Sequence, residues 1–221
     1  MGKTLVVIYA AGGFGREVAW LVESCSDASE EYVVACFADD NASVHSLKLN
    51  DVPVMGLEEA YRRFPNAVMI GAVGSPEIRQ QVMEKSASVG FSFGTFIHPR
   101  VERSRWLDVG IGTVICAGSI LTTNINLGKH VQINLDCTIG HDVVMGDYTT
   151  LAPGVHVSGW VHFGQRVYVG TGAVIINGTK ENPISIGDDA VIGAGACVAR
   201  SVPEGVTVVG VPARPLRRTM V

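Results

Sequence analysis

Among the six histidines of this chain, His141 stands in the setting best suited to chemistry. It follows Ile139-Gly140 and is followed directly by Asp142. A solvent-facing imidazole titrates near neutral pH and can act as a general base. A neighbouring carboxylate can orient such a ring and stabilise the imidazolium that proton transfer creates. These residues predict a His141–Asp142 pair for proton transfer, and the alternative is an ordinary surface histidine.

The cysteines and the other histidines show no spacing that is typical of a metal site or a redox motif. Five cysteines are scattered singly, without a CxxC motif, and no two histidines have the spacing of metal ligands. We therefore expect free, buried thiols and no metal. Cys137 lies four residues before His141, but it occupies a repeat position where Ala or Val would serve as well.

The stretch that must position His141 has an apolar residue at every sixth position. Twelve consecutive sixth positions are large and apolar: Val109, Ile115, Leu121, Leu127, Ile133, Ile139, Met145, Leu151, Val157, Phe163, Val169 and Ile175. A glycine often follows, and the fourth residue after each is mostly small or β-branched. Six is neither the helical nor the strand period, so the pattern predicts a hexapeptide parallel β-helix with three hexapeptides per coil. We expect the sixth-position side chains to stack inward, the glycines to ease the turns, and His141 to lie at a corner.

The period breaks once, after Ile175. The next members are Ile186, Ile192 and Val198, so an interval of eleven residues stands where six or twelve is expected. Residues 177–183 include glycine and proline and predict a loop that projects from the coils.

The N-terminal part is organised differently, with buried strands that alternate with turns and helices. Residues 5–10 predict a strand, residues 11–15 a glycine turn and residues 16–24 a helix, which together open a Rossmann-like unit. Helix-start amides after such a turn suit a phosphate, but the spacing is not GxGxxG, and a turn used only for tight packing is the alternative. Further strands are expected at 32–38, 67–73 and 91–96, and helices at 57–64 and 77–89.

Two polar turns follow the second and third of these strands. Asp39-Asp40 closes the second, and Gly74-Ser75 follows the third. In an open α/β sheet, ligands gather at the carboxyl ends of the strands, where an acidic residue commonly meets a ribose or base. A solvated turn is the alternative for the two aspartates.

Composition narrows the classes of function. The chain of 221 residues is 47% hydrophobic and 17% charged, with a net charge of -4. This composition supports a substantial core and argues against a nucleic-acid or anionic-membrane surface. The N-terminal apolar strand is too short for a signal peptide or a membrane span, so we expect a cytoplasmic protein. The predicted organisation is an α/β Rossmann-like domain at 1–96 and an all-β parallel β-helix domain with a short C-terminal tail at 97–221.

Several motifs resemble those of one enzyme family. They are residues 133–142, Gly146-Asp147-Tyr148, residues 151–154, residues 210–215 and the N-terminal residues 11–15. Together they are similar to the hexapeptide acyltransferases that acetylate bacterial sugars, in particular the nucleotide-sugar N-acetyltransferases and their sialic acid O-acetyltransferase relatives. The resemblance covers essentially the whole chain, and it implies that the β-helix is left-handed.

The resemblance implies roles for residues of the coils. His141 corresponds to the general base that takes a proton from the acceptor amine as it attacks the thioester of acetyl-CoA, and Asp142 to the acidic residue that supports it. Asn134 matches a polar residue of the acceptor pocket. The backbone amide of Gly159 matches one that meets the acetyl carbonyl. The positions that correspond to acetyl-CoA contacts are Thr150, where some members have a second histidine, and Thr171 and Ala194, along which the pantetheine and adenine run.

It also implies roles for the N-terminal part. Gly12-Gly13-Phe14 corresponds to the turn around the phosphates of the nucleotide sugar, and some relatives have histidine in place of Phe14. Asp39 and Asp40 match base or ribose contacts, and Gly74-Ser75 matches the next turn.

The expected activity is acetyl-CoA-dependent N-acetylation of a nucleotide-linked amino sugar of the 4-amino-4,6-dideoxy type, in the synthesis of lipopolysaccharide O-antigen or another surface glycan. Members of the family are homotrimers with the site between two solenoids, and neither a metal nor a covalent intermediate is expected. The first alternative is O-acetylation of a sialic acid. A NAD-binding oxidoreductase and a β-solenoid binding module without catalysis are more remote alternatives.

Overall fold

The computed structural model describes residues 2–216. The chain divides into two compact units. The first extends to Pro99 and includes Ile111–Val114, and the second comprises Arg100–Gly110 and continues from Ile115. The assignment of separate roles to segments 1–96 and 97–221 stays a prediction. Among the described residues, no helix has the length and apolar character needed to cross a membrane.

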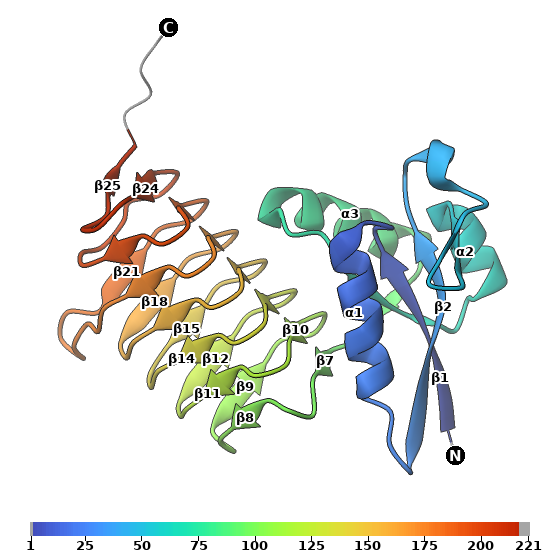
Figure 1. The fold of residues 1–221 in the computed structure, drawn as a ribbon, viewed down its shortest axis with the longest axis horizontal. Coiled ribbons are helices and arrows are strands. Elements are labelled where there is room, and N and C mark those ends of the chain that lie inside the picture. The colour runs from blue at the N-terminus through green and yellow to red at the C-terminus, as the bar shows by residue number, and fades with distance from the viewer. Residues whose placement is uncertain (1, 217–221) are drawn as a thin grey trace, which may run out of the picture. The chain divides into compact units, whose positions relative to one another are not determined.

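The first unit is built on a six-stranded sheet with the strand order β3-β4-β2-β1-β5-β6. Figure 1 shows β1 and β2 of this sheet side by side. Its strands are β1 (Gly2–Tyr9), β2 (Glu30–Ala38), β3 (Lys48–Leu49), β4 (Val52–Met55), β5 (Val68–Gly71) and β6 (Ser92–Phe93). Neighbouring strands are parallel except for the hairpin of β3 and β4. The central strands are buried on both faces, as their continuous apolar runs require.

Three α-helices connect these strands: α1 (Gly13–Ser24), α2 (Leu57–Arg63) and α3 (Pro76–Val89), with a short 3-10 helix at Ala42–Val44. Helix α3 has clear sequence signals at both ends. Pro76 occupies its first turn, and Gly90 ends it in the left-handed conformation, with φ of 116°.

The structure differs from the sequence prediction at three places in this unit. The strand predicted at 91–96 is two short strands, β6 and Phe96–Ile97, with a break at Gly94-Thr95. Helix α1 begins at Gly13, three residues earlier than expected, because Gly12 is already its extended N-cap residue. The β3–β4 hairpin was not predicted, and its turn residues Asn50 and Asp51 have φ of 49° and 66°. Two successive left-handed residues are typical of tight hairpin turns.

The second unit consists of stacked coils whose strands form three sheets, and Figure 1 shows the coils following one another from green to red. The first sheet begins with β7 (Phe96–Ile97) and β10 (Val114–Ile115), whose residues fall wholly or partly within the segments of the first unit. It continues with β13 (Gln132–Ile133), β16 (Thr150–Leu151), β19 (Tyr168–Val169), β22 (Val191–Ile192), β24 (Thr207–Val209) and β25 (Arg214–Pro215). The second contains β8 (Glu102–Arg103), β11 (Ile120–Leu121), β14 (Thr138–Ile139), β17 (His156–Val157), β20 (Val174–Ile175) and β23 (Cys197–Val198). The third contains β9 (Leu107–Val109), β12 (Ile125–Leu127), β15 (Val144–Met145), β18 (Val161–Phe163) and β21 (Ile184–Ile186).

The register of these strands confirms the parallel coils that the six-residue period predicts. Ile133 pairs with Leu151, Ile139 with Val157 and Met145 with Phe163, each 18 residues apart. From Ile115 to Ile175, every sixth-position side chain is at most 4% exposed. Burial of one such side chain contributes about 1.5–3 kcal/mol to folding. The left hand of the β-helix stays a prediction.

The predicted loop at 177–183 is also confirmed. Phe163 pairs with Ile186, a spacing of 23 residues in place of 18, so one corner of this coil contains five extra residues. Thr179 and Asn182 close the loop through reciprocal backbone hydrogen bonds.

The structure corrects the expected role of the corner glycines. None of the glycines that follow the sixth-position residues, such as Gly140 and Gly146, has a positive φ; the left-handed corner residues are other glycines, such as Gly154 and Gly172, and side-chain-bearing residues such as Asp142. The glycines are required by close approach instead, because a Cβ on Gly140 or Gly146 would lie within 3 Å of the backbone of the next coil. At these predicted positions, glycine therefore allows neighbouring corners to stack rather than the chain to turn.

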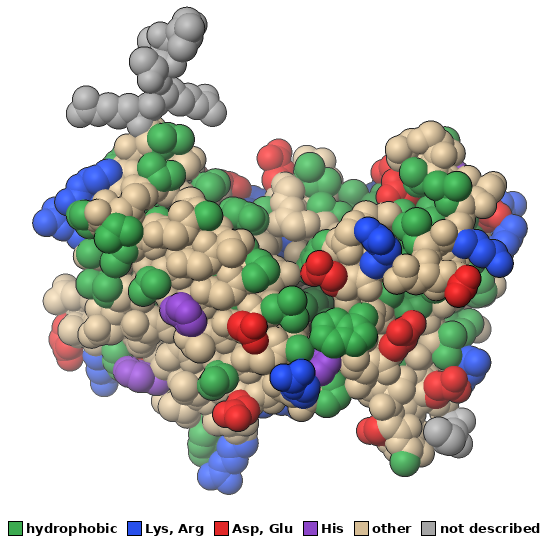
Figure 2. Space-filling view, in the orientation of Figure 1, with side chains coloured by type: hydrophobic (Ala, Val, Ile, Leu, Met, Phe, Trp, Pro, Cys, Tyr) green, Lys and Arg blue, Asp and Glu red, His purple; other side chains and the backbone are tan. Residues whose placement is uncertain are grey.

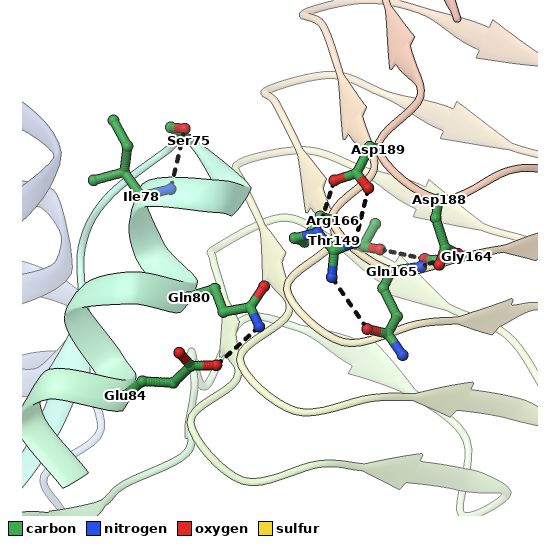
Figure 3. Close-up of polar contacts among 10 residues, drawn as sticks. All are labelled: Ser75, Ile78, Gln80, Glu84, Thr149, Gly164, Gln165, Arg166, Asp188 and Asp189. Atoms are coloured by element: carbon green, nitrogen blue, oxygen red, sulfur yellow. Dashed lines mark hydrogen bonds and ion pairs between the residues drawn. The ribbon is translucent and has the colours of Figure 1, made fainter. Parts of the chain in front are cut away.

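Side chains also link neighbouring corners. Asp188 accepts a hydrogen bond from the backbone N–H of Gln165, and Arg166 forms a two-bond ion pair with Asp189 at 2.7 Å (Figure 3). The hydrogen bonds from Arg166 hold the pKa of Asp189 below its usual value. Both residues are partly exposed, so the pair is a modest contribution that orders the corner.

The outer faces of the coils leave several apolar side chains in contact with solvent, and Figure 2 shows hydrophobic side chains at the surface over this part of the chain. Ile120 and Val174 point outward from the second sheet, and Val144 from the third. Each is about two-fifths exposed.

Gly15 provides a test of the packing between α1 and β1. A Cβ at this position would collide with the carbonyl oxygen of Ala10, whereas a Cβ on Gly13 would meet only the end of the Arg16 side chain, at 4.0 Å. We expect Gly15→Ala to lower the free energy of unfolding by about 1–3 kcal/mol through overpacking. Gly13→Ala is the matched control and should leave stability unchanged or slightly higher. Urea denaturation of both variants measures the difference, and equal midpoints would contradict it.

Candidate active site

His141 and Asp142 form one corner of the coils, between β14 and β15. Asp142 has φ of 57°, a left-handed conformation that reverses the chain. Its carboxylate oxygen Oδ2 lies 2.7 Å from His141 Nδ1. The histidine side chain is 54% exposed and the aspartate 25%. With Nδ1 donating its proton to the carboxylate, the Nε2 atom is the one that can accept a proton.

The imidazole of His141 rests against the next coil at Gly159. An added Cβ at Gly159 would lie 2.5 Å from both Cε1 and Nε2 of the ring, so only glycine leaves room for it. The amide nitrogen of Gly159 also stacks directly on Gly140. The indole ring of Trp160 lies edge to face with the imidazole, with 6.3 Å between the ring centroids. The backbone N–H of Trp160 donates to the His141 carbonyl. The structure thus brings His141, Asp142 and Gly159 together at one corner, and their roles stay a prediction.

Sequence reasoning missed Asn124, the equivalent corner residue of the preceding coil. Its side-chain Nδ2 donates a hydrogen bond of 3.2 Å to Asp142 Oδ1. The available signal was its position, 18 residues before Asp142, which is one full coil.

Other predicted residues lie along a different corner of the same coils. Asn134 is buried, and its side-chain amide donates to the carbonyl of Leu151 in the next coil at 2.8 Å. Thr171 and Ala194 follow on this corner, where the Thr171 carbonyl accepts the N–H of Gly195. One sheet face separates this corner from that of His141, so a single chain does not bring these residues to the histidine.

Two residues near these corners are buried within the coils. Thr150, on β16, is 1% exposed. Cys137 is fully buried, and burial raises the pKa of its thiol to about 11. A buried neutral thiol is a poor nucleophile, so Cys137 is a packing residue, as expected. All five cysteines are free, three of them buried and Cys25 and Cys197 partly buried.

The predicted residues of the first unit gather at the carboxyl edge of its sheet. Gly12, Gly13 and Phe14 form the start of α1, directly after β1. The Asp39 carboxylate accepts the backbone N–H groups of Ala11 at 2.8 Å and Asn41 at 2.9 Å. Asp39 therefore fastens the turn after β1 to the end of β2.

Asp40 and Ser75 complete this edge. Asp40 forms an ion pair of 2.7 Å with Lys85 of α3. Partial burial raises the pKa of this carboxyl and is the largest single influence, but the hydrogen bond and charge of Lys85, together with smaller contributions from Tyr9 and His45, outweigh it and leave the pKa below the usual value. Ser75 caps α3, because its hydroxyl accepts the N–H of Ile78 (Figure 3), and Gly74 precedes it with space for a Cβ. No group of three potential metal ligands occurs among residues 2–216.

Known proteins are similar to this chain over nearly its whole length. Residues 5–86 match the family model described as the PglD N-terminal domain. Over 219 residues, the chain is 32% identical to GDP-perosamine N-acetyltransferase of Escherichia coli O157:H7, with 96% of each chain covered. Among solved structures, WeeI from Acinetobacter baumannii AYE is 33% identical with a TM-score of 0.84, covering 97% of this chain and all of its own. PerB from Caulobacter crescentus, solved in complex with CoA and GDP-perosamine, is 28% identical with a TM-score of 0.84, covering 96% of this chain and 97% of its own.

The fit between His141 and Gly159 can be tested directly. We expect Gly159→Ala to displace the imidazole, because the new Cβ occupies the space of Cε1 and Nε2. The NMR signals of the His141 ring should shift while the thermal transition stays within a few degrees. Ser158→Ala, at the neighbouring position, is the control that should leave those signals unchanged. Unchanged ring signals in Gly159→Ala would show that the ring does not rest on this glycine.

Proposed function

The chain belongs to the nucleotide-sugar N-acetyltransferases, and we propose that it transfers the acetyl group of acetyl-CoA to the amino group of a nucleotide-linked 4-amino-4,6-dideoxy sugar. The family assignment rests on the 32% identity to GDP-perosamine N-acetyltransferase over 96% of both chains. The solved complex of PerB with CoA and GDP-perosamine supports both substrate classes. The acetylated nucleotide sugar would be made in the cytoplasm. It would serve as a building block for a surface glycan such as the lipopolysaccharide O-antigen.

The observation that carries the proposed mechanism is the 2.7 Å contact between His141 Nδ1 and Asp142 Oδ2. Nε2 of His141 takes the proton of the acceptor amine as its nitrogen attacks the thioester carbon. The C–N bond forms, the carbonyl oxygen becomes an oxyanion, and the C–S bond then breaks. Asp142 stabilises the imidazolium, which returns the proton to the departing thiolate. A positioned base of this kind contributes about a hundredfold or more to the rate.

The amide of Gly159 is the proposed partner of the oxyanion. It lies beside the imidazole because the corners of the two coils stack closely. A backbone donor that is fixed before the reaction stabilises developing charge without reorganisation. Base and oxyanion donor would therefore come from successive coils at one corner.

We propose that the first unit is Rossmann-like and binds the nucleotide sugar at the carboxyl edge of its sheet. The N–H groups at the start of α1, at Gly12, Gly13 and Phe14, suit the phosphates. Asp40, at the end of β2, is about half exposed and is placed to accept a hydrogen bond from the base or ribose. Asp39 contributes by holding the turn, since backbone N–H groups already occupy both of its oxygens.

A homotrimer with left-handed coils would complete the site. His141 lies on one corner of the coils and Asn134, Thr171 and Ala194 on another, so two copies would be needed to bring the base and the proposed CoA and acceptor contacts together. Thr150, on the face that ends at the second corner, is proposed to belong to the same CoA site. The outward Ile120 and Val174 supply apolar surface for such contact.

The proposal predicts that wild-type protein releases thiol from acetyl-CoA in the presence of a nucleotide-linked 4-amino sugar. His141→Asn should lower kcat by about a hundredfold or more, because it removes the base. The rate with the amino sugar should rise with pH as the acceptor ammonium loses its proton. A panel of GDP-, UDP- and dTDP-linked amino sugars, with free sialic acid included, identifies the acceptor.

Each alternative gives a different result in this assay. Turnover with sialic acid alone, without the rise in rate from amine deprotonation, would replace N-acetylation by O-acetylation. Full turnover in His141→Asn would exclude this histidine as the base. The absence of turnover with every acceptor would contradict the proposed reaction.

A further inference from the structure

Three successive coils have the same backbone geometry at the corner that contains His141. Asn124, Asp142 and Trp160 occupy equivalent positions, 18 residues apart, with φ of 55°, 57° and 57°. Backbone hydrogen bonds lock them in register: the N–H of Asp142 donates to the Thr123 carbonyl at 3.1 Å, and the N–H of Trp160 to the His141 carbonyl at 3.0 Å. The side chains of this column are therefore presented to one another by the stacking of the coils.

The side chains of the column form a chain of hydrogen bonds. Nδ2 of Asn124 donates to Oδ1 of Asp142 at 3.2 Å, and Oδ2 of Asp142 lies 2.7 Å from Nδ1 of His141. The two carboxylate oxygens thus have different partners, one on the preceding coil and one on the same corner. The terminal torsion of an aspartate is broad. A second partner on Oδ1 fixes the carboxylate in the orientation that points Oδ2 at the ring.

The hydrogen bond from Asn124 matters because the His141–Asp142 pair is exposed to solvent. The His141 side chain is 54% exposed, so water competes for both the ring and the carboxylate. An isolated exposed pair of this kind gains little from its electrostatic attraction. Holding one partner in place from a second coil reduces the number of arrangements that compete with the productive one.

The residue type at position 124 fits this arrangement. The position has left-handed backbone, which asparagine, aspartate and glycine tolerate better than other residues. Among these, only asparagine supplies an N–H donor on its side chain. Aspartate would place a second carboxylate beside Asp142 and repel it, and glycine would leave Oδ1 to solvent.

We propose that Asn124 is a positioning residue for acetyl transfer: its side-chain amide orients the Asp142 carboxylate so that Nδ1 of His141 keeps its proton and Nε2 accepts the proton of the acceptor. This inference rests on the proposed function, in which His141 is the base. Asn124 acts through Asp142 and touches neither substrate.

The test uses two substitutions that the left-handed backbone accepts. Asn124→Asp should lower kcat by about tenfold, because it replaces a donor to a charged group with a repelling carboxylate, and Asn124→Gly should lower kcat several-fold. KM for acetyl-CoA and for the amino sugar should stay within about twofold, since Asn124 contacts neither. Asn126→Asp makes the same chemical change at an exposed position of β12 and should leave kcat unchanged.

A spectroscopic measurement and a double-mutant cycle separate positioning from a general structural effect. Nitrogen-15 NMR of His141 should show the Nδ1–H tautomer in the wild type and a mixture of tautomers in Asn124→Asp. In an Asp142→Asn background, Asn124→Gly should have no further effect on kcat, because the residue that it orients no longer carries a carboxylate. Thermal transitions of the variants should lie within a few degrees of the wild type.

The outcomes distinguish this inference from the proposed function. Loss of turnover in His141→Asn, with wild-type kcat and an unchanged tautomer in both Asn124 variants, would overturn the role of Asn124 and leave the reaction intact. An increase in KM at unchanged kcat, or additive effects in the Asp142→Asn background, would also overturn it. Full turnover in His141→Asn would instead refute the base on which both proposals depend.

Discussion

The close stacking of corners is the constraint on which the second unit depends. Strands of two or three residues have too few hydrogen bonds to hold a sheet by themselves, so each coil is stabilised by the coils beside it. The apolar ladder that includes Ile133 and Leu151 supplies the buried surface, and glycines such as Gly140 and Gly146 let the backbones approach to the required distance. A Cβ at either glycine would separate the corners and break the register on both sides.

The same stacking positions the proposed chemistry. His141 and Asp142 are neighbours in the chain, but the space for the imidazole comes from Gly159 one coil further on. The second partner of the carboxylate comes from Asn124 one coil earlier. A regular 18-residue coil places each contributor at the same corner, so long loops are not needed to assemble the group. The regular coil also places Asn134 on a different corner, one sheet face away from His141. For this reason we propose a site that a second copy completes.

In the first unit, side-chain and backbone contacts hold polar turns at the carboxyl edge of the sheet. Asp39 joins the turn after β1 to the end of β2 through two backbone N–H groups, and Gly15 allows α1 to pack directly on the Ala10 carbonyl. These contacts give the start of α1 a fixed position relative to the strand ends. The ion pair between Asp40 and Lys85 joins the same edge to α3.

The sequence by itself determined the coil period, the loop at 177–183, the alternation of strands and helices before residue 97, and the pairing of His141 with Asp142. These features follow from local patterns, because a six-residue apolar period and a strand-turn-helix order are properties of neighbouring residues. Only the tertiary structure shows why positions 140 and 159 require glycine, that the Asp39 carboxylate accepts the N–H of Ala11, and that Asn124 reaches Asp142. Each of these depends on groups that are 18 or more residues apart in the chain, or on backbone atoms whose approach is set by stacking, and the side-chain pattern along the chain does not encode such distances.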